Sequence, residues 1–339
     1  MVSITGLSEQ TVCNYTQYFR QLVTTALELS GLKCIIRTRP CNIMTRTGLP
    51  PHSELSNLFE NEDRCIQWLK KHGCFDLERN CPICGTAMVL VAWKPSFRCL
   101  KRTCRKEETL GKGSFFASSK LPCSKILQIA YFWLQRIPTK AIISMTSMSE
   151  HTVCNFSQYF RQLACSALDL SDCVIGGEGI IVEIDESKFG KRKNHRGHRV
   201  EGVWVLGGVE RTESRKIFFV EVPNRSADTL LSIIRRHVAP GSIVYTDLWR
   251  GYAQLASALN LTHQTVNHSL YFKDPITGIH TNTIEGNWNG VKMRVAPRNR
   301  VKRSMDEFAG EMMWRRKHEA DLWSGFITAL RTVGYEDIE

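Results

Sequence analysis

Two patterns of hydrophobic and polar positions divide the chain near Gly176 and Gly177. Before these glycines, apolar residues recur at intervals of three and four, which is typical of helices that bury one face. After them, short apolar runs are bounded by turn residues and separated by helical stretches, which indicates strands alternating with helices. We therefore expect a helix-rich N-terminal half and an α/β (α+β) C-terminal half built on a mixed sheet.

The same patterns predict the individual elements. Helices are predicted over residues 55–71, 124–136, 140–146, 226–237 and 304–332. Strands are predicted over residues 179–184, 203–209, 217–222 and 242–245. A polar, proline-containing loop over residues 37–53 and a cysteine-bearing segment interrupt the first half. We expect four parts, namely residues 1–50, 51–120, 121–175 and 176–339.

A segment near the N-terminus is repeated later in the chain. Residues 3–30 and 144–171 align without gaps and match at most positions, and each copy has a Ser-Glu start before a stretch with helical spacing. The helix predicted over 140–146 would make the second copy a helix-turn-helix. The pair is either a duplicated segment or fused gene model, or a tandem DNA-binding unit. If the copies bind DNA, Arg20 and Arg161 on their polar sides would make the contacts, and we expect only the second copy to be needed.

Four cysteines stand at spacings that suit a zinc ribbon. Cys81 and Cys84 form a CPIC turn followed by glycine, and Cys99 and Cys104 supply a second pair after fifteen residues. Four thiolates bind Zn²⁺ tetrahedrally, so we predict a structural zinc in the 51–120 part. Free buried cysteines, which behave as small hydrophobic residues, are the alternative.

Composition restricts the classes of partner. Lys and Arg outnumber Asp and Glu by 45 to 33, which gives a net charge of +12 and favours a polyanion, although charge does not choose between DNA, RNA and an acidic membrane. The chain lacks an apolar run of about 18 residues and a secretion signal, so we expect it neither to span a membrane nor to be secreted. Its 13 cysteines are an odd number, which favours a reducing compartment over a disulfide scaffold.

Three carboxylates stand where metal-dependent phosphoryl transfer needs them. Asp185 and Asp247 each follow an apolar strand, and Glu285 opens a predicted helix. Two divalent ions about 4 Å apart would activate the attacking oxygen and neutralise the leaving one, and Mg²⁺ or Mn²⁺ prefers carboxylate ligands. Singly, each acid has a plain structural reading, as a turn, a helix cap or a surface ion pair. Together they match a ribonuclease H-like nuclease, and strand alternation places Glu183 on the face of Asp185.

Three segments carry a resemblance to a known family. GIIVEIDESKFGKRKNHRGHRVEGVWVLGGVER, SIVYTDLWRGY and HTNTIEGNWNGVKMR resemble the catalytic region of the Merlin transposases and their bacterial insertion-sequence relatives of the IS1016 and ISXO2-like type. The likeness extends over roughly residues 53–316 and leaves out the N-terminal copy of the repeat. It implies a DDE triad at Asp185, Asp247 and Glu285 on a ribonuclease H-like fold. Asp185 would bridge two Mg²⁺ or Mn²⁺ ions, and the other two carboxylates would each complete one site.

The resemblance also implies the partners. A DNA transposase binds terminal inverted repeats and target DNA, needs at least a dimer on DNA, and acts in the nucleus if the source is eukaryotic, otherwise in the cytoplasm. His280, Asn282 and Lys292 match family-like positions and are expected to contact phosphate or DNA. Basic groups flank the acids, and we expect DNA contacts from them as well, chiefly from Lys191, Arg192, Lys193, Lys292 and Arg294. The alternatives are a DNA-binding regulator that has lost catalysis and a nuclease that never joins strands.

Overall fold

The computed structural model describes residues 48–91, 94–190 and 202–335. The predictions for the first repeat copy and for Lys191, Arg192 and Lys193 concern residues outside these ranges. The described residues fall into two compact units. One lies within Met1–Ser157 and Glu319–Glu339, and the other lies within Gln158–His318. None of the helices among them is long and apolar enough to cross a membrane.

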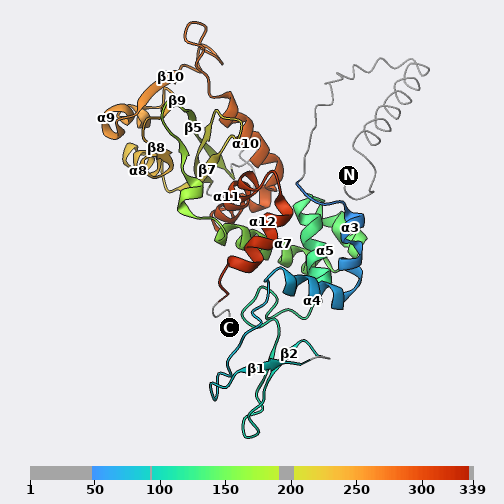
Figure 1. Ribbon diagram of the computed structural model, residues 1–339. Coiled ribbons are helices and arrows are strands. Elements are labelled where there is room, and N and C mark those ends of the chain that lie inside the picture. The colour runs from blue at the N-terminus through green and yellow to red at the C-terminus, as the bar shows by residue number, and fades with distance from the viewer. Residues whose placement is uncertain (1–47, 92–93, 191–201, 336–339) are drawn as a thin grey trace, which may run out of the picture. The chain divides into compact units, whose positions relative to one another are not determined.

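The first unit contains a small helical core (Figure 1). The helices of this core are α3 (His52–Glu60), α4 (Glu62–Lys71), α5 (Cys123–Leu134) and α12 (Leu322–Thr332). The single helix predicted over 55–71 is wrong, because the extended residue Asn61 separates α3 from α4 and caps α4 by accepting a hydrogen bond from the Arg64 amide. The prediction for α5 is confirmed to within two residues.

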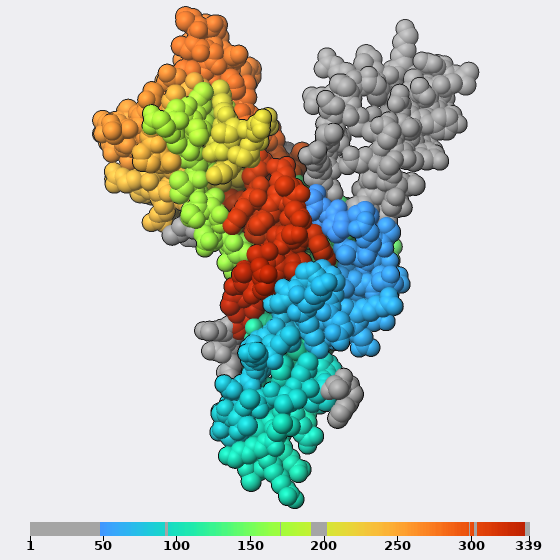
Figure 2. All heavy atoms as spheres, in the orientation of Figure 1, coloured from blue at the N-terminus to red at the C-terminus, as the bar shows by residue number. Residues whose placement is uncertain are grey.

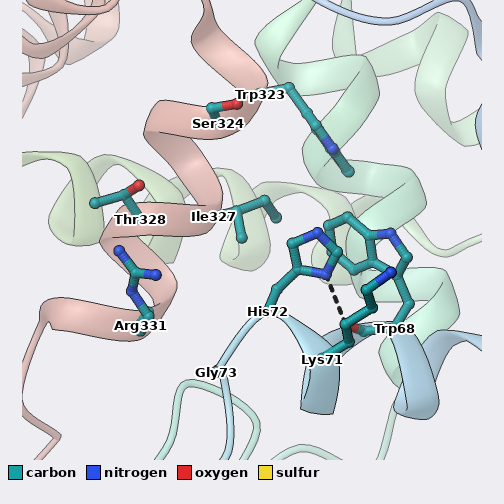
Figure 3. A pocket seen from close by; sticks show the side chains of 9 residues that line it. All are labelled: Trp68, Lys71, His72, Gly73, Trp323, Ser324, Ile327, Thr328 and Arg331. Carbon is teal, nitrogen blue, oxygen red and sulfur yellow. Dashed lines mark hydrogen bonds between the residues drawn. The ribbon is translucent and has the colours of Figure 1, made fainter.

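The C-terminal helix α12 belongs to this core rather than to the α/β unit. Trp323 is 7% exposed, and its ring lies 6.0 Å from that of Tyr131 and 6.1 Å from that of Trp68. Between α4 and α12 lies a groove of about 460 Å³. Figure 3 shows the Trp68 and His72 rings stacked on one side of the groove and Arg331 across it.

Two further helices confirm the predicted helix-turn-helix segment. They are α6 (Thr139–Thr146) and α7 (Glu150–Ser166), joined through Ser147 in a left-handed conformation. Ser149 caps α7, because its hydroxyl accepts a hydrogen bond from the Thr152 amide. The helix ends at Ser166, about one turn before the end of the second repeat copy at residue 171.

The second unit is built on a five-stranded mixed sheet with the order β10-β9-β5-β6-β7. The strands are β5 (Ile181–Phe189), β6 (Val203–Glu210), β7 (Ile217–Val222), β9 (Ile243–Asp247) and β10 (Thr262–Val266). Three consecutive antiparallel strands, β5 to β7, are extended beyond β5 by the parallel strands β9 and β10. A separate two-stranded pair joins β4 (Ile175–Gly176) to β8 (Val238–Ala239).

Helices cover both faces of the sheet (Figure 1). On one face, α8 (Ala227–His237) packs on Val182, Ile184 and Val244, and α9 (Leu255–Leu259) follows it. On the other face, α10 (Asn282–Arg294) and α11 (Lys302–Lys317) enclose a second core with Phe189 and Phe219. Because side chains alternate along a strand, β5 sends Glu183 and Asp185 toward α10, and Ile184 and Glu186 toward α8.

Several predicted boundaries are corrected. The strand that holds Asp185 does not end there but runs on to Phe189. Shortly after Asp247, the strand is followed by a short 3₁₀ turn, Arg250–Tyr252. The helix expected over residues 304–332 is two helices, α11 and α12.

Candidate active site and cysteine cluster

Two aspartates lie side by side on adjacent parallel strands. Glu183 of β5 is paired with Tyr245 of β9, and continuing this register by two residues sets Asp185 opposite Asp247. Strand alternation turns both side chains to the face that α10 covers. Asp247 is held by the Trp249 amide, which donates to its Oδ1 at 2.9 Å. The fold therefore brings together two acids that are 62 positions apart in sequence.

The Asp185 carboxylate is oriented from α10. The indole Nε1 of Trp288 donates to Asp185 Oδ2 at 3.0 Å. The ring fits there because Gly207, the β6 partner of Asp185, has no side chain, and a Cβ at this position would come within 2.6 Å of the Trp288 ring. Trp288 is a core residue at 3% exposure, and the sequence alone does not show its hydrogen bond to a candidate metal ligand.

The surroundings of Asp185 disfavour the charge of its carboxylate. Burial, and after it the nearby carboxylates of Glu186 and Asp247, raises its pKa to about 7. The hydrogen bonds from the Glu186 backbone and the Trp288 indole lower the pKa, but by less. A divalent cation between Asp185 and Asp247 would supply a positive charge, so these two residues fit a site for Mg²⁺ or Mn²⁺.

The third candidate, Glu285, lies in the first turn of α10, one turn before Trp288. Its side chain is 43% exposed, and its Oε1 lies 3.6 Å from His268 Nε2 and 3.4 Å from the Thr281 hydroxyl. The structure thus sets Glu285 on the helix that contacts Asp185. Among the described residues, the four cysteines alone form a group of three or more ligands close enough to hold a metal ion, so the structure does not bring Glu285 into one cluster with the two aspartates.

A fourth acid, Glu183, fixes the start of this helix. Its side chain is fully buried, and it accepts hydrogen bonds from the backbone amides of Thr283 at 2.8 Å and Ile284 at 3.0 Å, and from the Thr283 hydroxyl at 2.8 Å. These amides have no partner within their own helix, and a carboxylate satisfies both them and the positive end of the helix dipole. Glu183 therefore anchors the first turn of α10, which carries Glu285, to the strand that carries Asp185.

A cation and a histidine complete this anchor. Arg211 Nε lies 2.6 Å from Glu183 Oε1, and its guanidinium lies over the Tyr245 ring and donates to the His280 carbonyl. Burial lowers the pKa of His280, and the Arg211 charge lowers it further. His280 is thus uncharged at neutral pH, and any phosphate contact that it makes would be a neutral hydrogen bond.

The other residues predicted to bind DNA differ from one another in how exposed their side chains are. Asn282, Lys292 and Arg294 are exposed along α10. Arg161, in contrast, is not on a free polar surface: its guanidinium lies over the Phe308 ring at 4.6 Å and its Nε is 3.8 Å from Glu307. Arg161 is therefore engaged by side chains of α11, and its contact with DNA stays a prediction.

Behind Asp185, the opposite face of the sheet holds a second polar group. Tyr252 donates to Glu186 Oε2 at 2.6 Å, and Arg225 pairs with Glu186 Oε1 at 3.0 Å. The Arg225 guanidinium lies between the rings of Trp204 and Trp249, 4.0 and 4.2 Å from their centroids. Both tryptophans pack against Arg225, and these contacts hold the loop after Asp247 against β6.

The predicted zinc ligands come together in the first unit. Strands β1 (Met88–Leu90), β2 (Ser96–Cys99) and β3 (Glu107–Thr109) form a small antiparallel sheet. The Sγ atoms of Cys81, Cys84, Cys99 and Cys104 all lie within 4.8 Å of one another. A tetrahedral zinc with bonds of about 2.3 Å requires sulfurs about 3.8 Å apart. The cluster therefore fits one zinc ion, and Thr86, by hydrogen bonding, lowers the pKa of Cys84 to about 6, which favours the thiolate.

Residues 174–317, which contain this mixed sheet, its two aspartates and the helix with Glu285, match the ISXO2-like transposase domain, a DDE-type domain. The chain is also 38% identical over 101 residues to an uncharacterized transposase-like protein of Haemophilus influenzae, an alignment that covers 30% of this chain and 80% of the bacterial protein. The chain belongs to the ISXO2-like transposase family. The expected family is thereby confirmed at this level, and such domains act on DNA with divalent metal ions.

Proposed function

We propose that this chain is a DNA transposase that cleaves DNA at the ends of a mobile element and joins the freed 3′ ends to target DNA. One observation carries the proposal. Asp185 and Asp247 lie on neighbouring parallel strands, each two residues beyond the paired residues Glu183 and Tyr245, and the helix that contacts Asp185 also carries Glu285. The strand order, with three antiparallel strands extended by two parallel ones, supports a ribonuclease H-like arrangement, and the three motifs support a place among the Merlin-type members.

Each residue of the site has a proposed part in the reaction. Asp185 would contact both metal ions, while Asp247 and Glu285 would each complete one site. Two such ions would lower the pKa of the attacking water and neutralise the charge that develops on the leaving oxygen. Trp288 and Glu183 hold Asp185 and the Glu285-bearing helix in place, which matters because displacements of about 1 Å weaken catalysis strongly.

The first unit would supply the contacts that select the element's ends. We infer that a zinc ion holds the four-cysteine ribbon together and that the basic residues around it contact the DNA backbone. The groove between α4 and α12 offers Lys71 and Arg331, with the hydroxyls of Ser324 and Thr328, as further phosphate contacts. Two ends must be held together for transposition, so we also propose a dimer or higher oligomer on DNA.

Strand transfer distinguishes a transposase from a nuclease that shares the same site. The substrate is a duplex with the terminal inverted repeat of the encoding element and a free 3′-hydroxyl at the cleavage position, mixed with supercoiled plasmid and Mg²⁺ or Mn²⁺. We expect products in which the duplex is covalently joined to the plasmid. Cleavage of an uncut end without any joining would support the nuclease, and binding without either reaction would support the regulator.

A further inference from the structure

A hairpin between β10 and α10 exposes several large apolar side chains. It comprises residues 267–281 and stands out from the rest of its unit as the orange projection in Figure 2. The exposed fractions are 68% for Leu270, 48% for Tyr271, 82% for Phe272 and 94% for Ile276. Single exposed apolar residues are ordinary, but several on one projection indicate a surface that binds something.

The tip of the hairpin is fixed by its own hydrogen bonds. Asp274 Oδ1 accepts from the amides of Ile276 at 2.9 Å and Thr277 at 2.8 Å, and the Asp274 amide donates to the Ile279 carbonyl at 2.9 Å. Gly278 closes the turn with a φ of 71° and donates to the Asp274 carbonyl. Ile276 is therefore presented on an ordered turn, which reduces the entropy lost when it binds, and Phe272 lies two residues before this turn.

The base of the same hairpin contacts the candidate active site. His268 hydrogen-bonds the Thr281 hydroxyl at 2.7 Å, and both residues lie beside the Glu285 carboxylate. Phe272 follows His268 by four residues, so its backbone lies within about 14 Å of His268. Since bases in a strand are about 3.4 Å apart, Phe272 is within about four base steps of DNA bound at Glu285.

The charge of the hairpin favours DNA over a second copy of the chain, because Lys273 would face a polyanion in DNA but a chain of net charge +12 in a second copy. The Asp274 carboxylate is used within the turn, whereas Lys273 next to Phe272 is exposed. An apolar wedge beside a cation suits insertion between base pairs with a phosphate contact alongside.

We propose that this hairpin inserts Phe272 between base pairs of the bound DNA next to the cleavage position, with Lys273 on the neighbouring phosphate. The proposal rests on the proposed transposase function, and it adds a residue that opens the helix where the strand is cut. Unstacking is most favourable at flexible or distorted base steps, so the hairpin would also favour such steps at the cut site.

The test places the fluorescent base 2-aminopurine, one position at a time, around the cut site of a duplex carrying the inverted repeat. Fluorescence is measured with the full chain in Ca²⁺, and cleavage is measured separately in Mg²⁺. We compare Phe272→Ala with Phe272→Trp, which keeps a large ring, and with Met293→Ala, whose side chain is 88% exposed on α10 outside the hairpin. Wild type, Phe272→Trp and Met293→Ala should brighten the probe at one position, and Phe272→Ala should lose that signal and bind roughly tenfold more weakly.

Each contrary outcome has a distinct meaning. If wild type cleaves the duplex while the probe stays dark at every position, or if Phe272→Ala still brightens it, the wedge is refuted and the transposase function stands. If wild type neither binds nor cleaves, both fail. A loss of sedimentation mass in DNA-free Phe272→Ala, with its DNA signal intact, would instead make the hairpin a contact between copies of the chain.

Discussion

At the scale of single residues, Asp185 shows how the site is prepared for a metal ion. The carboxylate is partly buried, has another aspartate opposite it and receives one hydrogen bond from Trp288. Burial and the neighbouring carboxylates disfavour its charge more than this hydrogen bond favours it, and its pKa is raised to about 7. The sequence predicted Asp185 as a ligand from the apolar strand before it. It could not predict the Trp288 bond, because that bond depends on a glycine in another strand and on the packing of α10.

The raised pKa predicts how the stability of the metal-free protein changes with pH. Folded Asp185 binds its proton more tightly than the unfolded residue, whose pKa is about 4, so its favourable contribution is complete below about pH 4 and is lost as pH rises through 7. Asp185→Asn carries no charge and keeps an acceptor for Trp288. It should therefore unfold at a higher temperature than wild type at about pH 8, with a smaller difference at about pH 5.

Thermal unfolding in chelator at the two pH values checks this, with the exposed acid Asp228 as the matched control through Asp228→Asn. Saturating Mg²⁺ should stabilise wild type and leave Asp185→Asn unchanged. An Asp185→Asn protein that is less stable than wild type by the same amount at both pH values would show that Asp185 is not under electrostatic strain.

At the scale of elements, the strength of the apolar pattern decides what the sequence could predict. Strand β7 was predicted over its observed residues, and α8 was predicted with Ser226, which caps it, as its first residue. Strand β10 was missed because it is an edge strand in which Val266 alone is buried. The breaks at Asn61 and between α11 and α12 were missed although each lies in or beside a run of polar residues, 60–64 and 315–319, because a single helix was predicted across each run.

The hydrogen bonds by which Glu183 of β5 anchors α10 could also not be predicted from the sequence. Alternation set Glu183 on the correct face, but its partners, the amides of Thr283 and Ile284, are 100 and 101 positions away. Only the folded chain shows that a buried carboxylate caps the helix that carries Glu285. A buried acid in a strand next to a catalytic one is the signal that could have suggested it.

Substituting Glu183 should loosen the Glu285-bearing helix without dismantling the sheet. Glu183→Gln keeps the size of the side chain, but it loses the charge that Arg211 pairs with and presents N–H groups to helix amides that need acceptors. We expect the metal concentration for half-maximal cleavage to rise about 10- to 100-fold, as for groups that orient metal ligands. Hydrogen exchange should show faster exchange at the Thr283 and Ile284 amides.

Glu210→Gln is the matched control, because Glu210 is a buried acid of the neighbouring strand and bonds to Gly176, Thr212 and Ser214 rather than to α10. If both variants unfold at similar temperatures and Glu183→Gln also keeps the wild-type metal requirement and exchange rates, Glu183 has a structural role only.

At the scale of the whole molecule, the first unit contains a ribbon that a metal ion would hold together. The second unit has a large apolar core. The ribbon around Cys81 and Cys104 has short strands and little core of its own, whereas the α/β unit buries apolar residues on both faces of its sheet. The two units should therefore respond differently to the loss of metal.

Removing zinc should unfold the ribbon and leave the sheet of the second unit intact. Apparent binding energies of about 10 kcal/mol or more are folding energies for such modules. We expect one zinc per chain by elemental analysis, and we expect Cys84→Ser to lose the zinc and the hydrogen-exchange protection of β1 to β3 while that of β5 and β6 stays unchanged. Freshly purified protein without zinc, or a protected ribbon in Cys84→Ser, would refute the zinc site.

The most direct measurement of the central claim is metal-dependent cleavage of end DNA by variants of the three acids. Asp185→Asn, Asp247→Asn and Glu285→Gln each remove a ligand charge and preserve volume. Binding to the same duplex is measured in parallel, and Asp228→Asn serves as the control. We predict that wild type and the control cleave in Mg²⁺ or Mn²⁺, and that all three acid variants bind the duplex but do not cut it. Cleavage at the wild-type rate by any one of the three would remove that residue from the site and contradict the account.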